Sequence, residues 1–183
     1  MERQPTQNTP QPGAPPLDVL ILAAGLGTRM RSATAKVLHK LGGRPLIAHV
    51  CRAAVALQKE QRPVYVVVGH QAEEVERAVR DELGASGAAF ITQVEQRGTG
   101  DAVLAAREAL AGSNSTLLVL SGDVPFVRAE TLGALVHQHR THRGRGAACT
   151  LLSVRLEDPT GYGRVIRDAD GRFERVVEQK DAT

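Results

Sequence analysis

Short apolar runs alternate with helical patterns along most of this chain, and this alternation restricts its fold more than any other feature. The apolar runs that are typical of strands occupy Val19–Ala23, Pro63–Val68, Ala88–Thr92, Thr116–Leu120 and Ala147–Leu156. The segments with helical spacing are Pro45–Lys59, Ala72–Leu83, Thr99–Leu110 and Arg128–Arg143. Uninterrupted apolar runs are typical of strands that are buried on both faces of a sheet. The order of the segments therefore predicts an α/β fold with a doubly wound, mostly parallel sheet.

The two ends of the chain carry different signals. Residues 1–16 hold five of the nine prolines and almost no large apolar side chain, so they are interpreted as a disordered leader. The folded domain is expected to span 17–183. Near its end, Ala169-Asp170-Gly171 joins the apolar segments Arg164–Arg167 and Arg172–Val177, and an Asp-Gly pair in this position predicts a tight hairpin.

Composition argues against several classes of function. Aromatic residues make up 3% of the 183 residues and Trp is absent, so the chain lacks the stacking surface that single-stranded nucleic acid needs. No apolar stretch approaches the roughly 20 residues of a membrane span, and the N-terminus lacks the apolar run of a signal peptide. Cys51 and Cys149 lie in apolar patterns and are interpreted as small core residues. We therefore expect a cytoplasmic domain with no nucleic-acid or membrane partner.

A glycine-rich, basic loop follows the first apolar run, with the sequence Leu22-Ala23-Ala24-Gly25-Leu26-Gly27-Thr28-Arg29-Met30. The surrounding stretch 19–59 contains no Asp or Glu. Its cationic side chains are Arg29, Arg31, Lys36, Lys40, Arg44, Arg52 and Lys59. Charge of one sign beside a glycine-rich turn suits a polyphosphate. Two further loops, Gln93–Gly100 and Ser121–Pro125, follow later strands, and all three are expected at the carboxyl edge of the sheet, where ligands bind.

Three classes of phosphate-binding loop compete for the first segment. The P-loop is excluded because Gly25 and Gly27 lack its G-x-x-x-x-G-K-[ST] spacing. The dinucleotide fingerprint is disfavoured because Met30 stands at its third glycine and the stretch 19–59 offers no acidic residue for a ribose. A sugar-nucleotide pyrophosphorylase loop fits, because its glycines admit phosphates and nearby cations such as Lys36 balance their charge.

A series of motifs in order resembles one bacterial family. The motifs are Leu22–Met30, Lys36–His39, Gly43–Val50, Gln93–Ala102, Gly122–Pro125, Asp158–Arg164 and Val177–Ala182. Together they resemble the N-acetylglucosamine-1-phosphate uridyltransferases, a resemblance that implies a Rossmann-like nucleotidyltransferase fold. The first loop alone is also similar to loops of isoprenoid-pathway cytidylyltransferases and of molybdopterin guanylyltransferases, so these relatives remain alternatives.

The resemblance implies a set of site residues. Arg29 and Lys36 match the catalytic cations, Asp123 matches a Mg²⁺ ligand, and Gly163 and Glu178 match sugar contacts. Positions that match nucleotide contacts are Leu22, Ala23, Ala24, Gly25, Gly27, Thr28, Lys36, Gln93, Gly98, Thr99, Ser121, Gly122 and Asp123. The implied reaction is the Mg²⁺-dependent transfer of UMP from UTP to N-acetylglucosamine-1-phosphate, which gives UDP-N-acetylglucosamine and pyrophosphate for cell-wall precursors. The oligomeric state stays open.

The chain departs from this family in three respects. Ala35 stands where the family usually has Pro, and the change is expected to loosen the loop before Lys36. Asp101 stands where the family often has His, and it adds negative charge near the phosphates. The family's domain continues beyond position 183 with a second Mg²⁺ ligand and further sugar contacts, and a β-helix acetyltransferase domain follows it. The sequence therefore predicts a fold that is incomplete at its C-terminus, and a fragment that binds nucleotide without turnover remains an alternative.

Overall fold

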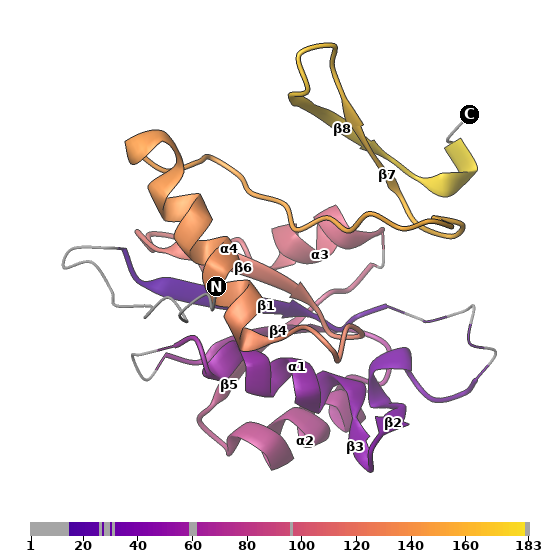
Figure 1. The fold of residues 1–183 in the computed structure, drawn as a ribbon. Coiled ribbons are helices and arrows are strands. Elements are labelled where there is room, and N and C mark those ends of the chain that lie inside the picture. The colour runs from indigo at the N-terminus through magenta and orange to yellow at the C-terminus, as the bar shows by residue number, and fades with distance from the viewer. Residues whose placement is uncertain are drawn as a thin grey trace, which may run out of the picture.

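The centre of the fold is a four-stranded parallel sheet with the strand order β5-β4-β1-β6. The strands are β1 (Leu17–Leu22), β4 (Val64–Val68), β5 (Ala88–Thr92) and β6 (Thr116–Ser121). The computed structural model describes residues 15–25, 27, 30, 32–58, 62–95 and 97–181. Helices lie on both sides of the sheet (Figure 1). The predicted doubly wound, parallel α/β architecture is confirmed.

Helices pack on the sheet through two separate cores. The helices are α1 (Leu46–Val55), α2 (Ala72–Leu83), α3 (Thr99–Ala105) and α4 (Ala129–Thr141). One core joins the sheet to α1, α2 and α4, and a smaller core joins it to α3. Val19 and Ile21 of β1 lie in the first core and Leu20 lies in the second, and all three are fully buried. This two-sided burial explains why β1 is an uninterrupted apolar run.

Shorter elements complete the described chain. They are the 3₁₀ turns η2 (Lys36–Leu38), η3 (His142–Gly144) and η4 (Gln179–Asp181) and the strand pairs β2 (Lys40–Leu41) with β3 (Arg44–Pro45) and β7 (Arg164–Arg167) with β8 (Phe173–Val177). The β7–β8 pair is antiparallel. In its turn, Asp168 Oδ1 accepts hydrogen bonds from the backbone N–H groups of Asp170 and Arg172 at 3.0 and 2.8 Å. The predicted hairpin is therefore confirmed.

The strand predicted over Ala147–Leu156 is wrong. Residues 147–156 form no strand in the described structure, and Leu151, Leu152 and Val154 expose 53%, 57% and 71% of their surface. A strand needs a neighbouring backbone for its N–H and C=O groups. This segment pairs with no described strand, and β6 is the outermost strand on its side of the sheet. Cys149 lies in the segment and is consequently exposed, which corrects its expected place in the core.

Most of the other predicted elements keep their positions with small changes at their ends. The helix predicted over Thr99–Leu110 ends at Ala105, and turns carry the chain onward. Cys51 is buried in α1, where burial and the nearby Glu82 carboxylate raise the pKa of its thiol to about 12. Such a thiol stays protonated and unreactive at neutral pH, which agrees with the core position predicted for Cys51.

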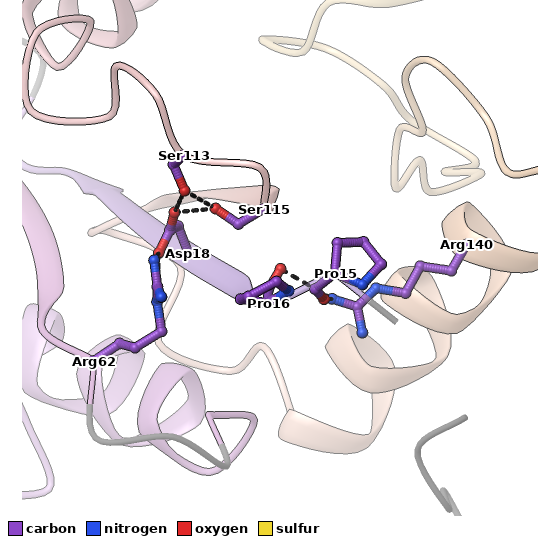
Figure 2. A network of polar contacts seen from close by, with 7 residues as sticks. All are labelled: Pro15, Pro16, Asp18, Arg62, Ser113, Ser115 and Arg140. Atoms are coloured by element: carbon purple, nitrogen blue, oxygen red, sulfur yellow. Dashed lines mark hydrogen bonds and ion pairs between the residues drawn. The ribbon is translucent and has the colours of Figure 1, made fainter. Parts of the chain in front are cut away.

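A polar network anchors the amino-terminal end of β1 (Figure 2). Asp18 is 1% exposed, and its Oδ1 accepts hydrogen bonds from Arg62 Nε and Nη2 at 2.8 and 2.6 Å. Its Oδ2 accepts hydrogen bonds from Ser113 Oγ at 2.7 Å and from the Ser115 hydroxyl. One carboxylate therefore joins the segments that precede β4 and β6 to the first strand.

The predicted leader 1–16 falls mostly outside the described residues, which begin at Pro15. Arg140 of α4 donates from Nη2 to the carbonyl oxygens of Pro15 and Pro16 at 2.6 and 3.3 Å (Figure 2). These two residues are thus held against the domain, while the extent of the leader stays a prediction. Among the described residues, no helix combines the length and apolar character that a membrane crossing requires.

Candidate functional site

A cavity of about 890 Å³ opens at the carboxyl ends of the parallel strands. Its walls come from the loops that follow β1, β5 and β6, from η2 and from the segment before β7. The lining residues are Leu22, Ala23, Ala24, Gly25, Gly27, Met30, Lys36, Val37, Gln93, Gly98, Thr99, Ala102, Ser121, Asp123, Thr160, Gly161 and Tyr162. Doubly wound sheets bind their ligands at this edge, so the cavity is the candidate functional site.

The loop after β1 forms one wall of the cavity. Ala23 is fixed there by a hydrogen bond from its backbone N–H to Val67 O of β4 at 2.8 Å. Gly27 has a φ of +60°, and a Cβ atom at this position would lie 2.9 Å from Lys36 Cβ. The backbone conformation and the close approach of Lys36 both require glycine at position 27. Gly25 carries neither constraint, since a Cβ atom there would meet no described atom within 4 Å.

The two glycines are therefore expected to respond differently to alanine. Gly27→Ala should lower the free energy of unfolding by about 1–2 kcal/mol, because its positive φ and its contact with Lys36 penalise a Cβ atom. Gly25→Ala should change stability by less than about 0.5 kcal/mol. It should still weaken nucleotide binding, because the added methyl group would occupy the cavity surface. Urea unfolding and nucleotide titration of both variants measure this difference, and equal losses of stability would contradict it.

Lys36 and Asp123 form an ion pair on the cavity surface. Lys36 Nζ lies 2.6 Å from Asp123 Oδ2, and the two side chains are 40% and 30% exposed. The β1–β6 pairing positions Asp123, because the preceding residue, Gly122, donates its N–H to Leu22 O at 2.9 Å. A Cβ atom at Gly122 would lie only 3.1 Å from that oxygen. The sheet thus places a cation and a carboxylate beside the glycine-rich loop.

A long-range hydrogen bond restrains the loop before Lys36. Ala35 is 1% exposed, and its N–H donates to Gln71 Oε1 at 2.5 Å. Gln71 precedes α2 and has a φ of +53°, an uncommon conformation for a residue other than glycine. A proline at position 35 would lack the N–H that this bond uses. Gln71 therefore supplies a restraint on the loop that the sequence alone did not reveal.

Removal of the Gln71 side chain should disturb Lys36. Gln71→Ala leaves the buried N–H of Ala35 unpaired, which should cost about 1–3 kcal/mol of stability and weaken nucleotide binding. Ala35 has a φ of −52°, which proline also adopts. Ala35→Pro should therefore restore nucleotide affinity in the Gln71→Ala background. In the wild type it should reduce affinity, because there it breaks the bond.

Calorimetric titration of the single and double variants with a nucleotide measures the rescue. Gln71→Glu keeps an acceptor at the same place and serves as the matched control, with affinity close to that of the wild type. Additive losses in the double variant would contradict a shared role of Ala35 and Gln71 in positioning Lys36.

Gln93 contributes a fixed amide to the wall that follows β5. It is 5% exposed, and its backbone N–H donates to Val68 O at 2.8 Å. Its side-chain Nε2 donates to Asp101 Oδ2 at 2.7 Å and to Gly98 O at 3.4 Å. Asp101 lies in the first turn of α3, where negative charge is favourable to the helix dipole. The Gln93 amide, at a position that the resemblance implies as a nucleotide contact, is thus held in place by its neighbours.

The cavity brings most of the predicted site residues together. Those on its surface are Leu22, Ala23, Ala24, Gly25, Gly27, Lys36, Gln93, Gly98, Thr99, Ser121 and Asp123. Thr28 and Arg29 lie outside the described residues. Gly122, Gly163 and Glu178 are not among the lining residues, although Gly122 packs directly behind the cavity against Leu22. The roles assigned to these residues stay predictions.

Sequence reasoning missed several lining residues. They are Met30, Val37, Ala102, Thr160, Gly161 and Tyr162. All six lie in motifs that the sequence singled out, but the motifs did not show which of their residues reach the cavity. Asp158 shapes the segment that holds the last three, because its Oδ1 accepts hydrogen bonds from Thr160 Oγ1 and N at 2.6 and 3.0 Å, which lower the pKa of the carboxyl. Tyr162 is 59% exposed and offers an aromatic ring at the cavity.

A metal ion in this cavity would depend on one protein carboxylate. The described residues contain no group of three or more His, Cys, Asp or Glu side chains that could hold a metal. Asp123 is the only carboxylate among the described lining residues. Mg²⁺ is commonly held by one or two carboxylates together with substrate phosphates, so a single carboxylate fits this ion. A cation on Asp123 Oδ2 would have to displace the Lys36 ammonium.

Several curated proteins that are similar to this chain in sequence share the name bifunctional protein GlmU. The bifunctional protein GlmU of Anaeromyxobacter dehalogenans (strain 2CP-C) is 52% identical over 168 residues, and that of Solibacter usitatus (strain Ellin6076) is 51% identical over 168 residues. Each alignment covers 92% of this chain but 33% or 34% of the relative. The chain therefore spans about a third of the length of the curated relatives it matches. The resemblance that the motifs predicted is confirmed.

Solved structures share the fold at lower sequence identity. A UDP-glucose pyrophosphorylase complexed with UDP-glucose superposes with a TM-score of 0.63 and 20% identity, over 88% of this chain and 68% of that one. The 4-diphosphocytidyl-2C-methyl-D-erythritolsynthase from Anaerococcus prevotii DSM 20548 gives 0.55 and 14%, over 88% and 63%. Residues 19–174 match the family described as the MobA-like NTP transferase domain. Because this match covers most of the chain, the chain belongs to the family of MobA-like NTP transferase domains.

Proposed function

We propose that this domain transfers UMP from UTP to N-acetylglucosamine-1-phosphate and releases pyrophosphate. The observation that carries the proposal is the Lys36–Asp123 pair beside the glycine-rich loop, at the edge of the sheet where nucleotides bind. The relatives named GlmU and the UDP-glucose pyrophosphorylase complexed with UDP-glucose support a uridine nucleotide and a sugar phosphate as substrates.

In the proposed reaction, an oxygen of the sugar 1-phosphate attacks the α-phosphorus of UTP, and the bond to the pyrophosphate oxygen breaks. Such a transfer needs no protein nucleophile, so the residues have to position the phosphates and balance their charge. In this scheme the backbone N–H groups of Gly25 and Gly27 approach the phosphates, and Lys36 and Arg29 balance the charge of the leaving pyrophosphate. Asp123 would hold Mg²⁺, which would stabilise charge on phosphoryl oxygens. Gly163 and Glu178 contact the amino sugar in this scheme.

Two other functions use the same cavity. A relative of cytidylyl- or guanylyltransferases would hold CTP or GTP beside the same loop. The fold shared with the 4-diphosphocytidyl-2C-methyl-D-erythritolsynthase keeps this alternative open. A domain that binds UTP without turnover is the second alternative, because Lys36 Nζ already pairs with Asp123, the only carboxylate among the described lining residues.

A pyrophosphate-release assay on the full chain separates these functions. It combines Mg²⁺ and N-acetylglucosamine-1-phosphate with UTP, CTP, GTP or ATP in parallel. We expect release with UTP that requires both the sugar phosphate and Mg²⁺. Release with CTP or GTP in place of UTP would contradict the proposal. A thermal shift with UTP but no release would identify the binding module instead.

A further inference from the structure

The contact between Asp101 and Gln93 has a consequence for base recognition. We propose that Asp101 is a positioning residue that fixes the orientation of the Gln93 amide and thereby lets the cavity distinguish uracil from cytosine. This inference rests on the proposed function, because a nucleobase has to reach Gln93, which lines the cavity.

The hydrogen bonds allow one orientation of the amide. The Asp101 carboxylate and the Gly98 carbonyl only accept hydrogen bonds, so both require the Nε2 group of Gln93. A flipped amide would place Oε1 against these two acceptors, at positions now 2.7 and 3.4 Å from Nε2. Because Gln93 is 5% exposed, water cannot relieve that repulsion at low cost. Asp101, with the shorter of the two bonds, is the main determinant of the orientation.

The fixed orientation leaves Oε1 of Gln93 for the ligand. Both bonds to Asp101 and Gly98 use Nε2, and Oε1 accepts no hydrogen bond from another described residue. An amide oxygen accepts from a ring N–H. Uracil carries a hydrogen on N3 and therefore matches Oε1, whereas N3 of cytosine carries a lone pair and opposes it. A site built to bond one group rejects an analogue that lacks it, because the buried partner is then unpaired.

The negative charge of Asp101 offers a competing explanation with a different signature. Repulsion between the carboxylate and the phosphates would weaken the binding of UTP, CTP and pyrophosphate alike. The orientation of Gln93 would instead change the preference for UTP over CTP. It would not affect the affinity for pyrophosphate, which carries no base.

Dissociation constants of the full chain for UTP, CTP and pyrophosphate, measured by titration calorimetry with Mg²⁺, test the proposal. The wild type should prefer UTP over CTP by about tenfold or more. Asp101→Leu removes the acceptor and should bring the preference close to unity. Asp101→Asn retains an acceptor oxygen and removes the charge, so it should keep most of the preference. Gln93→Met should also abolish the preference, and Asp101→Leu should have no further effect on the preference in that background.

Thermal unfolding of each variant establishes that it is folded. An unchanged preference in Asp101→Leu would overturn the proposal, and so would an equal loss of preference in Asp101→Asn and Asp101→Leu. If Asp101→Leu does not fold, Gln93→Met decides, because a preference that persists in this variant overturns the proposal. A wild-type chain that binds UTP and CTP equally well contradicts the role of Asp101 alone. A wild-type chain that binds neither nucleotide contradicts the proposed function as well.

Discussion

Asp123→Asn is expected to lower Mg²⁺-dependent pyrophosphate release by about 10²- to 10³-fold, because it removes the charge of the only carboxylate among the described lining residues. The substitution preserves the size of the side chain. It also frees the Lys36 ammonium, which lies 2.6 Å from Asp123 Oδ2, so UTP binding without Mg²⁺ should persist. The loss should therefore fall on turnover and on the Mg²⁺ dependence of UTP binding. Steady-state release and UTP titrations with and without Mg²⁺ measure both quantities.

Asp81→Asn is the matched control for this substitution. Asp81 is an exposed carboxylate of α2 that does not line the cavity, so the variant should keep the activity and the Mg²⁺ dependence of the wild type. If Asp123→Asn also kept its Mg²⁺ dependence, the assignment of Asp123 as the metal-holding residue would be wrong.

Asp18→Ala is expected to lower the free energy of unfolding by about 3 kcal/mol. The substitution removes the carboxylate that joins Arg62, Ser113 and Ser115 (Figure 2). Asp18 is 1% exposed, whereas the Arg62 side chain is 32% exposed and Ser113 is exposed, so these partners regain water and the expected loss is that of the hydrogen bonds to the buried carboxylate. Urea denaturation followed by circular dichroism measures the loss.

Asp170→Ala is the matched control for Asp18→Ala. The Asp170–Arg172 ion pair spans 2.8 Å, but its side chains are 68% and 73% exposed, and exposed pairs of this kind contribute about 0–1 kcal/mol. Equal destabilisation by the two substitutions would contradict a structural role for the buried network.

The same network predicts how stability depends on pH. Burial raises the pKa of Asp18, but hydrogen bonds from Ser115, Ser113 and Arg62 together outweigh burial and hold the pKa below its usual value. The stabilising contribution of the ionised group is complete above the unfolded-state pKa of about 3.9 and is lost as the pH falls through the lower folded-state pKa. Wild-type stability should therefore fall more steeply than that of Asp18→Asn between about pH 5 and pH 2.

The sheet could be predicted from the sequence because its central strands are apolar on both faces. β1 and β4 lie between helices, so nearly every side chain in them is buried and the local pattern is sufficient. The segment 147–156 has a similar apolar content and forms no strand. Its failure shows that pairing depends on a neighbouring backbone, and a local pattern contains no information about that neighbour.

In the candidate site, too, the local motifs could be predicted from the sequence and the contacts between distant residues could not. Its loops could be located because each is a short contiguous motif that directly follows a strand, as with Gly25 and Gln93. The Ala35–Gln71 hydrogen bond joins residues 36 positions apart and depends on the left-handed backbone of Gln71, so no motif marked it. The bond from Gln93 to Asp101 likewise depends on how the loop after β5 folds against α3, so the sequence alone did not predict it, although Asp101 departs from the family at that position.

We expect the cavity at the carboxyl ends of β1 and β6 to bind UTP. The most direct test is an NMR titration of the ¹⁵N-labelled chain with UTP and Mg²⁺, which reports binding at each backbone amide. We expect the largest shifts at amides on the cavity surface, among them Ala23, Gly25, Gln93 and Thr99. The amides around Asp18, at the opposite end of β1, should change little. Shifts confined to the β7–β8 hairpin or to the amino-terminal ends of the strands, with the cavity amides unchanged, would contradict the claim.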